Sequence, residues 1–340
     1  MTLLIIANNI DGNIDGIGKH ALMLSEEFRR IGHKVRTLSA TSGFNKVYSF
    51  FTFKMSIVYC KAIFEVVRGN FDYIIVEYPF KEHNPLIMLF HLFMFIETRF
   101  CKTKIAFSMH EYDRVNVLRR RIIDVLLRLS DVIFVSENKY FQKFPSLAKK
   151  MHMRTIPNHI ECNKKNKTFN PTAFCYFGLV NPSKAFNEML KAWDAFNGDN
   201  TFTLHIISST NLKDWELESH KGVRYYHNLE NKDVVDIMFK CAFSIVPVIP
   251  EIGYNNSSFV SAVQCGCIPI GKFANVLRSK DFVLHVEDYE CEHFVGILKQ
   301  TQKIELSEFN VMSRSCLIFG EEFSLSKTAN QMLTAFETHD

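Results

Sequence analysis

Short apolar runs alternate with longer amphipathic segments along the first half of the chain. A short apolar run bounded by turn residues predicts a buried strand, whereas apolar residues at intervals of three and four predict a helix. We expect strands at residues 2–7, 35–38, 73–76, 105–108 and 132–135, and helices at 18–31, 48–68, 85–100 and 117–129. Strands and helices that alternate at this spacing are typical of a parallel sheet with helices on both faces.

A polar stretch rich in lysine and asparagine, residues 160–171, interrupts this alternation and predicts a linker. The pattern then restarts. We expect strands at 174–177, 203–207, 225–227, 243–246, 268–270 and 282–286, helices at 186–196, 231–240, 257–265 and 290–301, and terminal helices from about residue 305.

The two halves predict an α/β protein with two Rossmann-like, doubly wound domains that face each other across a cleft. The expected boundaries are 1–160 for the N-terminal domain, 161–172 for the linker and 173–320 for the C-terminal domain, with a terminal helix at 321–340 that can return to the N-terminal domain. Ligands of such sheets bind beyond the carboxyl ends of the strands.

Composition supports a folded chain and narrows the partners. Its 340 residues suggest about two domains, and 47% hydrophobic with 22% charged residues exclude disorder as the main state. A net charge of +4 does not argue for nucleic acid, but it is compatible with a nucleotide diphosphate or an acidic lipid surface. The nine cysteines lack metal-ligand spacing and are expected to be reduced, buried thiols.

The chain start has no signal-peptide features, which favours the cytoplasm. The apolar stretch at 86–95 is too short to span a membrane, so it predicts a buried or membrane-facing helix.

Three segments place polar or glycine residues where strands are expected to end. The loop with Gly16 and Gly18 follows the first strand, and glycines there let a ligand approach the backbone at a helix N-terminus. His110 follows the strand at 105–108, where it can bind a substrate hydroxyl or transfer a proton. Lys184 follows the first strand of the second half and can neutralise a diphosphate. Each also has a plainer interpretation: a tight turn, a loop histidine and a solvated lysine.

Glu251 lies in a loop after an apolar strand, in the segment Pro250–Ser258. Ser257 and Ser258 are expected to open a helix, whose N-terminus favours an anion. A phosphate and a carboxylate that binds hydroxyl groups would then lie close together. Taken alone, an exposed glutamate in a loop is more often inert.

Together these segments resemble the retaining, GT-B-fold glycosyltransferases of the large family-4 group, also called glycosyl transferases group 1. The matching segments follow the family's order along nearly the whole chain. They are Gly16-Ile17-Gly18-Lys19-His20, Gly32-His33-Lys34-Val35, Phe107-Ser108-Met109-His110-Glu111, Ile156-Pro157-Asn158-His159-Ile160-Glu161, 177–184, 246–251 and 261–270.

The resemblance implies roles for these residues. His110, Glu251 and Lys184 would be catalytic, with Lys184 at the donor phosphates, Glu251 at the sugar hydroxyls and His110 at the reacting face. The implied donor-binding set is Gly178, Lys184, Glu251, Gly253, Tyr254, Asn255, Asn256, Ser257 and Ser261, and the loop that borders acceptor and diphosphate is Gly16, Ile17, Gly18 and Lys19. The group works without a metal, so no metal and no cofactor are expected beyond the nucleotide-sugar donor.

Three positions depart from the family's pattern. Leu179 stands where an arginine is expected, and Ala185 where a glycine is expected. The second glutamate of the donor loop is replaced by Phe259 or Ser261, depending on the alignment. These losses imply a changed donor, weaker donor binding or lost activity.

The leading hypothesis is therefore a metal-independent, retaining hexosyltransferase that moves a sugar from a nucleotide-diphosphate donor to a glycan or lipid-linked glycan in bacterial surface polysaccharide synthesis. No nucleic acid partner is expected. The alternatives are a non-catalytic relative that acts as a binding or scaffold protein, and a nicotinamide-dependent oxidoreductase with an incomplete glycine fingerprint.

The phenylalanine-rich segment at 48–66 and the basic cluster Arg119-Arg120-Arg121 suggest peripheral contact with the inner face of an anionic membrane. An amphipathic core helix with solvated charges is the alternative for the first of these segments.

Overall fold

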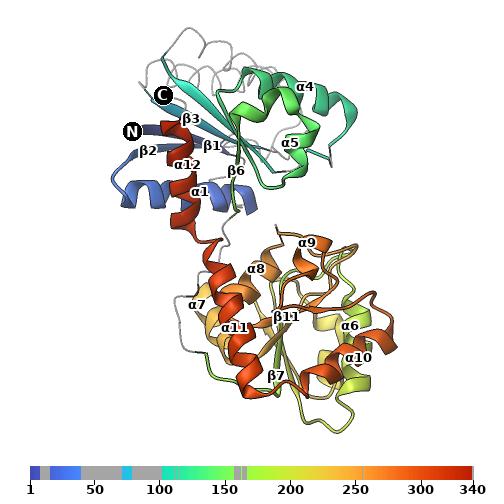
Figure 1. The fold of residues 1–340 in the computed structure, drawn as a ribbon. Coiled ribbons are helices and arrows are strands. Elements are labelled where there is room, and N and C mark those ends of the chain that lie inside the picture. The colour runs from blue at the N-terminus through green and yellow to red at the C-terminus, as the bar shows by residue number, and fades with distance from the viewer. Residues whose placement is uncertain are drawn as a thin grey trace. The chain divides into compact units, whose positions relative to one another are not determined.

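The computed structural model describes residues 1–7, 16–39, 71–78, 102–110, 112–113, 115–156, 162, 167–254 and 256–338 (Figure 1). The chain divides into two compact units, which are Met1–Pro157 with Leu325–Asp340, and Asn158–Ser324. Each unit contains a parallel sheet of six strands flanked by helices. The predicted α/β class with two doubly wound domains is therefore confirmed. The helices predicted at 48–68 and 85–100 lie outside the described residues.

The first unit has the strand order β2-β1-β3-β4-β5-β6. Its strands are β1 (Thr2–Ala7), β2 (Lys34–Ser39), β3 (Tyr73–Tyr78), β4 (Lys104–Met109), β5 (Val132–Val135) and β6 (Met151–Met153). Its described helices are α1 (Gly16–Arg30), α4 (Val117–Leu129), α5 (Lys139–Lys143), the 3-10 helix η1 (Pro145–Lys150) and α12 (Leu325–Glu337). The strand order reverses between β1 and β3, and ligands of open α/β sheets bind at such a switch point.

Alternate residues of the strands in this unit face opposite layers of helices. Leu3 and Ile5 pack in one core with residues of α1 and α12, whereas Leu4 and Ile6 pack in a second core with residues of α4. Both faces of the sheet are covered, so the strands β1, β3 and β5 are nearly continuous apolar runs.

Helix α12 closes the first of these cores (Figure 1). Phe336 stacks on Tyr73, with ring centroids 4.1 Å apart, and the Tyr73 hydroxyl donates a 3.0 Å hydrogen bond to the Phe336 carbonyl. The last helix of the chain is thus part of the first unit, which begins at residue 1.

The second unit has the strand order β12-β11-β10-β7-β8-β9. Its strands are β7 (Ala173–Phe177), β8 (Thr203–Ser208), β9 (Val223–His227), β10 (Phe243–Ile245), β11 (Ile268–Gly271) and β12 (Leu284–His285). Its helices are α6 (Phe186–Phe196), α7 (Asn231–Lys240), α8 (Ser257–Gln264), α9 (Asn275–Arg278), α10 (Cys291–Thr301) and α11 (Leu306–Glu321), with 3-10 turns η2 (Lys213–Trp215) and η3 (Leu217–Ser219). Here the order reverses between β7 and β10.

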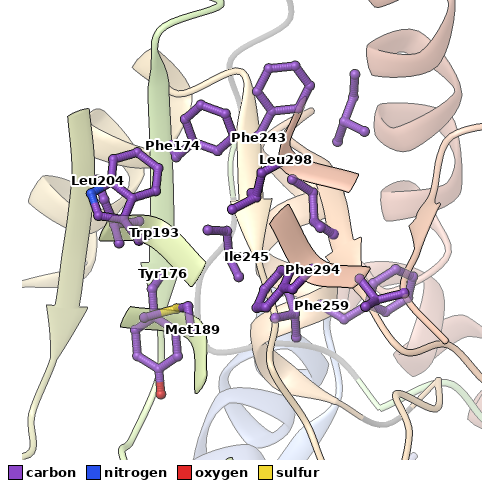
Figure 2. Close-up of a cluster of buried hydrophobic side chains, with 14 of the residues drawn as sticks. Phe174, Tyr176, Met189, Trp193, Leu204, Phe243, Ile245, Phe259, Phe294 and Leu298 are labelled. Carbon is purple, nitrogen blue, oxygen red and sulfur yellow. The ribbon is translucent and has the colours of Figure 1, made fainter. Parts of the chain in front are cut away.

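Aromatic side chains fill the core of the second unit (Figure 2). Phe174 of β7 stacks on Phe243 of β10 at 5.0 Å and meets Trp193 of α6 edge-on at 5.4 Å. Leu298 of α10 is also fully buried in this core. Such contacts hold the central strands rigidly, so the loops at their carboxyl ends start from fixed positions.

No helix among the described residues is both long and apolar enough to cross a membrane. The stretch at 86–95, for which a membrane-facing helix was one expectation, lies outside those residues.

Candidate functional site

The face of the first sheet that is covered by α1 and α12 becomes polar at the carboxyl ends of β3 and β4. Tyr73 and Ile75 of β3 lie in the apolar core on this face, and Glu77 follows them at the same two-residue spacing. On β4, Ser108 is paired with Glu77 in the ladder, and His110 follows two residues later. A carboxylate, a hydroxyl and an imidazole are therefore brought together beside the switch point of the sheet.

Arg154, directly after β6, completes this cluster. Its Nη1 and Nη2 lie 2.8 Å and 3.0 Å from the two carboxylate oxygens of Glu77, and Nη1 also donates to Ser108 Oγ at 2.8 Å. Nε2 of His110 lies 2.6 Å from Glu77 Oε2. Glu77 is fully buried and Arg154 is only 3% exposed, so the ion pair is shielded from water.

Burial alone would raise the pKa of Glu77, because a carboxylate loses its hydration in the core. The charge of Arg154 and the hydrogen bond from His110 outweigh that cost and hold the pKa of Glu77 well below its usual range. Glu77 is therefore an ionised carboxylate at neutral pH.

The predicted loop of residues 16–19 forms the first turn of α1. Gly18 is buried, while Ile17 and Lys19 are half-buried. His20, in the same turn, is 2% exposed, and its Nε2 lies 3.2 Å from Nη2 of Arg154. The start of α1 is thus connected to the Glu77 cluster through Arg154.

Of this cluster, sequence reasoning identified only His110 as a site residue. Glu77 carried a usable signal, because it is the one charged residue in the buried strand Tyr73–Tyr78. Arg154 carried less, since a three-residue strand precedes it and was not predicted. Glu111, the neighbour of His110 in the quoted motif, lies outside the described residues.

In the second unit, the two predicted donor segments follow the two strands that flank the switch point, β7 and β10. The segments are joined by backbone hydrogen bonds. Lys184 forms an isolated antiparallel bridge with Val248, the amide of Ile249 donates to the Ser183 carbonyl at 2.9 Å, and that of Ala185 donates to the Pro247 carbonyl at 2.8 Å. Lys184 is therefore positioned beside the loop that leads to Glu251.

Gly178, at the end of β7, lies against the N-terminus of α8. Its φ of +141° is in the region that favours glycine, and a Cβ at this position would lie 2.6 Å from Oγ of Ser258. Asn256 caps the helix by accepting a 3.0 Å hydrogen bond from the Phe259 amide. The first turn of α8 is thus held against the end of β7, with its remaining amide groups at the same edge of the sheet.

Lys184 is half-buried, and its Nζ has no hydrogen-bond or ion-pair partner among the described residues. Desolvation lowers the pKa of Lys184 to about 8. A cation held in this way, without a carboxylate beside it, is suited to an anionic ligand. Leu179, where the family's pattern has an arginine, is 55% exposed.

Glu251 is exposed, and the loop that carries it is anchored by Ile252. Ile252 is fully buried, donates a 2.7 Å hydrogen bond to the Lys272 carbonyl and accepts one of 3.0 Å from the Ala274 amide. Gly253 is exposed, and Tyr254 is half-buried. The carboxylate of Glu251 therefore extends from a fixed backbone into solvent.

The other predicted donor residues divide by exposure. Ser257 is exposed and Asn256 is half-buried, but Ser261 and Phe259 are fully buried. The two candidates for the second position of the donor loop therefore have no surface that a ribose could contact in this structure. Asn255 lies outside the described residues.

A pocket of about 600 Å³ opens beside the Glu251 loop. Its lining comprises Ala185, Glu188, Lys191, Ile249, Pro250, Lys272, Asp288, Tyr289, Glu290 and Cys291. The pocket carries charges of both signs, and Lys184 and Glu251 are not among its lining residues.

Within the described part of the chain, Asp288, Glu290 and His293 form the one group whose ligand atoms could hold a metal ion. Asp288 accepts hydrogen bonds from His293 Nδ1 at 2.8 Å and from the Glu290 amide at 2.9 Å. These bonds at the start of α10 account for the grouping without an ion.

The sequence matches no family model, and no curated protein matches it by sequence. Solved structures do resemble it over their whole length. The Anabaena protein HepE, in complex with UDP and glucose, has a TM-score of 0.68 at 9% identity, with 99% of this chain and 100% of HepE covered. An alpha-glucosyltransferase in complex with UDP and a 13-mer DNA has a TM-score of 0.67 at 13% identity, covering 99% and 98%.

A glycosyltransferase from Rickettsia africae has a TM-score of 0.74 at 12% identity, with 99% of this chain and 98% of that chain covered. At these identities the likeness concerns the arrangement of the chain and not its chemistry. The chain has the GT-B fold of two Rossmann-like domains.

Proposed function

We propose that this protein is a glycosyltransferase whose donor is a nucleotide-diphosphate sugar, and that the donor diphosphate binds to the second unit at Lys184 and the N-terminus of α8. The observation that carries the proposal is that the loops after β7 and β10 are joined by the bridge between Lys184 and Val248. It holds Lys184, a cation with no counter-ion among the described residues, beside the loop that leads to Glu251. The N-terminus of α8 lies at the same edge of the sheet, against Gly178.

The chemistry follows from these three groups. When the bond between the sugar C1 and the diphosphate oxygen breaks, the leaving diphosphate keeps the electron pair and gains negative charge. Lys184 and the amides of α8 would stabilise that charge without a metal ion. Glu251 would accept hydrogen bonds from sugar hydroxyls and so orient the donor. We propose retention of the anomeric configuration, with the acceptor hydroxyl attacking the face that the diphosphate leaves.

The departures at Leu179 and Ser261 bear on the nucleotide. An exposed leucine supplies no charge to the diphosphate, and a buried serine supplies no hydroxyl to the ribose. We therefore expect donor binding to be weaker than in a site with an arginine and a second glutamate at these positions. They also support the second candidate, a glycosyltransferase-like protein that binds a nucleotide or glycan without turnover.

The decisive experiment separates these two functions. Isothermal titration with UDP, GDP, ADP and dTDP identifies the base, and Lys184→Met should weaken binding of that nucleotide at least tenfold. Lys303→Met, an exposed lysine of the same unit, is the matched control and should leave binding unchanged. Hydrolysis or transfer of the corresponding sugar nucleotide supports the enzyme, binding without turnover supports the second candidate, and no binding of any nucleotide refutes the proposal.

For the acceptor we propose a glycan or lipid-linked glycan at the cytoplasmic face of a bacterial membrane, as in surface polysaccharide synthesis. One solved neighbour was determined with DNA as well as UDP, so transfer assays should include duplex DNA beside glycan and lipid-linked acceptors. Transfer to DNA would overturn this choice.

A surface of α4 supports the membrane contact. Val117, Arg121, Val125 and Arg128 recur at the spacing of one helix face, all four are exposed, and Leu118 beside them is 64% exposed. Arg120 does not contribute, because its guanidinium donates to backbone carbonyls. Binding to vesicles with anionic lipid, but not to neutral ones, and its loss on replacing Leu118 by Asp would support the contact. Equal recovery with both vesicles would contradict it.

A further inference from the structure

The imidazole of His110 has two different ends. Nε2 lies 2.6 Å from Glu77 Oε2 and 3.3 Å from Nη2 of Arg154. Nδ1 makes no hydrogen bond among the described residues, and 9% of the side chain remains exposed. The protein therefore holds Nε2, and no described residue bonds Nδ1.

The short contact decides where the imidazole proton lies. An ionised carboxylate oxygen can only accept a hydrogen bond. A ring nitrogen without a proton can likewise only accept one. At 2.6 Å two acceptors would repel each other. Nε2 therefore carries the proton and donates a hydrogen bond to Glu77. A neutral His110 in this tautomer has its lone pair on Nδ1.

The surroundings keep Glu77 in the accepting form. Arg154 donates to both of its oxygens, and the hydroxyl of Ser108 donates to Oε1 at 3.2 Å. With His110, each carboxylate oxygen accepts two hydrogen bonds, which is close to the capacity of a carboxylate. Protonation of Glu77 would break at least one of these bonds.

The same neighbours surround the ring of His110. The charged side chains that contact it are Glu77 and Arg154, whose Nη2 lies 3.3 Å from Nε2. The ring centroid of His20 is 5.8 Å away, and its Nε2 lies 3.2 Å from Nη2 of Arg154. Ser108 of β4 and Met332 of α12 add no charge.

We propose that Glu77 is a positioning residue, which holds His110 as the Nε2–H tautomer and so presents the Nδ1 lone pair to a substrate hydroxyl. Identifying that hydroxyl with a sugar or acceptor hydroxyl rests on the proposed function. If the proton moves during transfer, the O–H bond breaks, an Nδ1–H bond forms, and the imidazolium is stabilised by Glu77. Arg154 acts on His110 only through Glu77, which it keeps ionised.

The tautomer can be measured without any activity. Protein labelled with ¹⁵N-histidine is examined by long-range ¹H–¹⁵N correlation spectra at pH 7.5, and the His110→Asn variant identifies the signals of His110 among the 13 histidines. We expect the wild-type ring to be a single Nε2–H tautomer. An Nδ1–H tautomer, or rapid exchange between the two, would overturn the proposal even if the protein transfers sugar.

Variants test whether Glu77 causes this state. Glu77→Gln places an amide beside Nε2 that can either donate or accept, so His110 should become a mixture of tautomers. Ser108→Ala removes a hydrogen bond to the same carboxylate but leaves the contact with His110, so the tautomer should persist. If Glu77→Gln does not fold, the wild-type and Ser108→Ala spectra still decide the question.

Kinetics add a second readout. Glu77→Gln should lower kcat on the order of 100-fold, as expected for a misdirected acid–base group. It should also alter the pH profile of kcat. Nucleotide affinity in the second unit should be unchanged. An equal loss at all pH values together with weaker nucleotide binding would indicate a structural role instead. Absence of all transfer activity, with the Nε2–H tautomer intact, would refute the proposed function and not this inference.

Discussion

Replacing Arg154 by Met would leave the carboxylate of Glu77 buried without a cation. The two side chains are similar in length, so the change removes charge and hydrogen bonds and opens little space. Arg154 makes two hydrogen bonds to Glu77, and bonds to charged groups are worth roughly 1.5–3 kcal/mol each. Breaking a buried ion pair from one side costs about 3–5 kcal/mol in other proteins. We therefore expect the free energy of unfolding of the first unit to fall by about 3–5 kcal/mol at pH 7.5.

The loss should depend on pH in a defined direction. In the wild type the pKa of Glu77 is held well below its usual range, so its contribution to stability is present above the unfolded pKa of about 4.3 and is lost as pH falls through the folded value. Without Arg154, burial raises the pKa of Glu77, and the folded state then takes up a proton more readily. The variant should therefore be least impaired near pH 4–5 and most impaired above pH 7.

Urea denaturation followed by two probes can assign the loss to one unit. Both tryptophans, Trp193 and Trp215, lie in the second unit, so their fluorescence should show an unchanged transition, while far-UV circular dichroism should show the first unit unfolding at lower urea. Arg128→Met, at an exposed arginine of α4, is the control and should change stability by less than about 0.5 kcal/mol.

A loss below about 1 kcal/mol, or an equal shift of the tryptophan transition, would refute this reasoning. In the double variant with Glu77→Gln the orphaned charge is removed as well, so part of the stability should return.

Three further outcomes follow from the structure. Gly178→Ala should destabilise the second unit by about 1–3 kcal/mol, because its φ is +141° and the new Cβ meets Ser258. The control Gly198→Ala, whose Cβ meets no atom within 4 Å, should not destabilise it. Equal urea midpoints of the two variants, monitored by tryptophan fluorescence, would contradict this prediction. Because the pKa of Lys184 is lowered to about 8, its charge is lost as pH rises, so nucleotide affinity measured by calorimetry should fall about tenfold between pH 7 and 9, and a flat profile would exclude Lys184 from the site. Phe336→Ala removes the ring that stacks on a buried tyrosine and should cost the first unit about 3–5 kcal/mol in urea denaturation; a cost below about 1 kcal/mol would show that α12 contributes little to that core.

Local patterns predicted most elements because they report local conformation and burial. The helices at 117–129, 186–196 and 231–240 and the strand at 132–135 have the predicted bounds. Errors occurred where the pattern is short or burial misleads. β6 has three residues and was missed, and the strand predicted at 282–286 is only Leu284–His285, because Phe282 and Val286 are buried as side chains outside the ladder.

The candidate donor segment was identified from the same kind of pattern. Glu251, Lys184 and Gly178 were identified from their places after expected strands and from the family they resemble. The burial of individual residues of this segment could not be predicted, because it depends on which helix face meets the sheet. That is why Ser261, a candidate from its spacing, is enclosed in the core.

By itself the sequence determined that the chain forms two sheets of alternating strands and helices, and which segments end at their carboxyl edges. Only the tertiary structure decided that Glu77 and Arg154, 77 residues apart, share one buried ion pair with His110. The physical reason is that strand order and register depend on packing summed over a whole sheet, whereas periodicity describes each segment alone. Placing β3 beside β4, and β6 one strand beyond β5, converts three separated polar residues into one connected cluster.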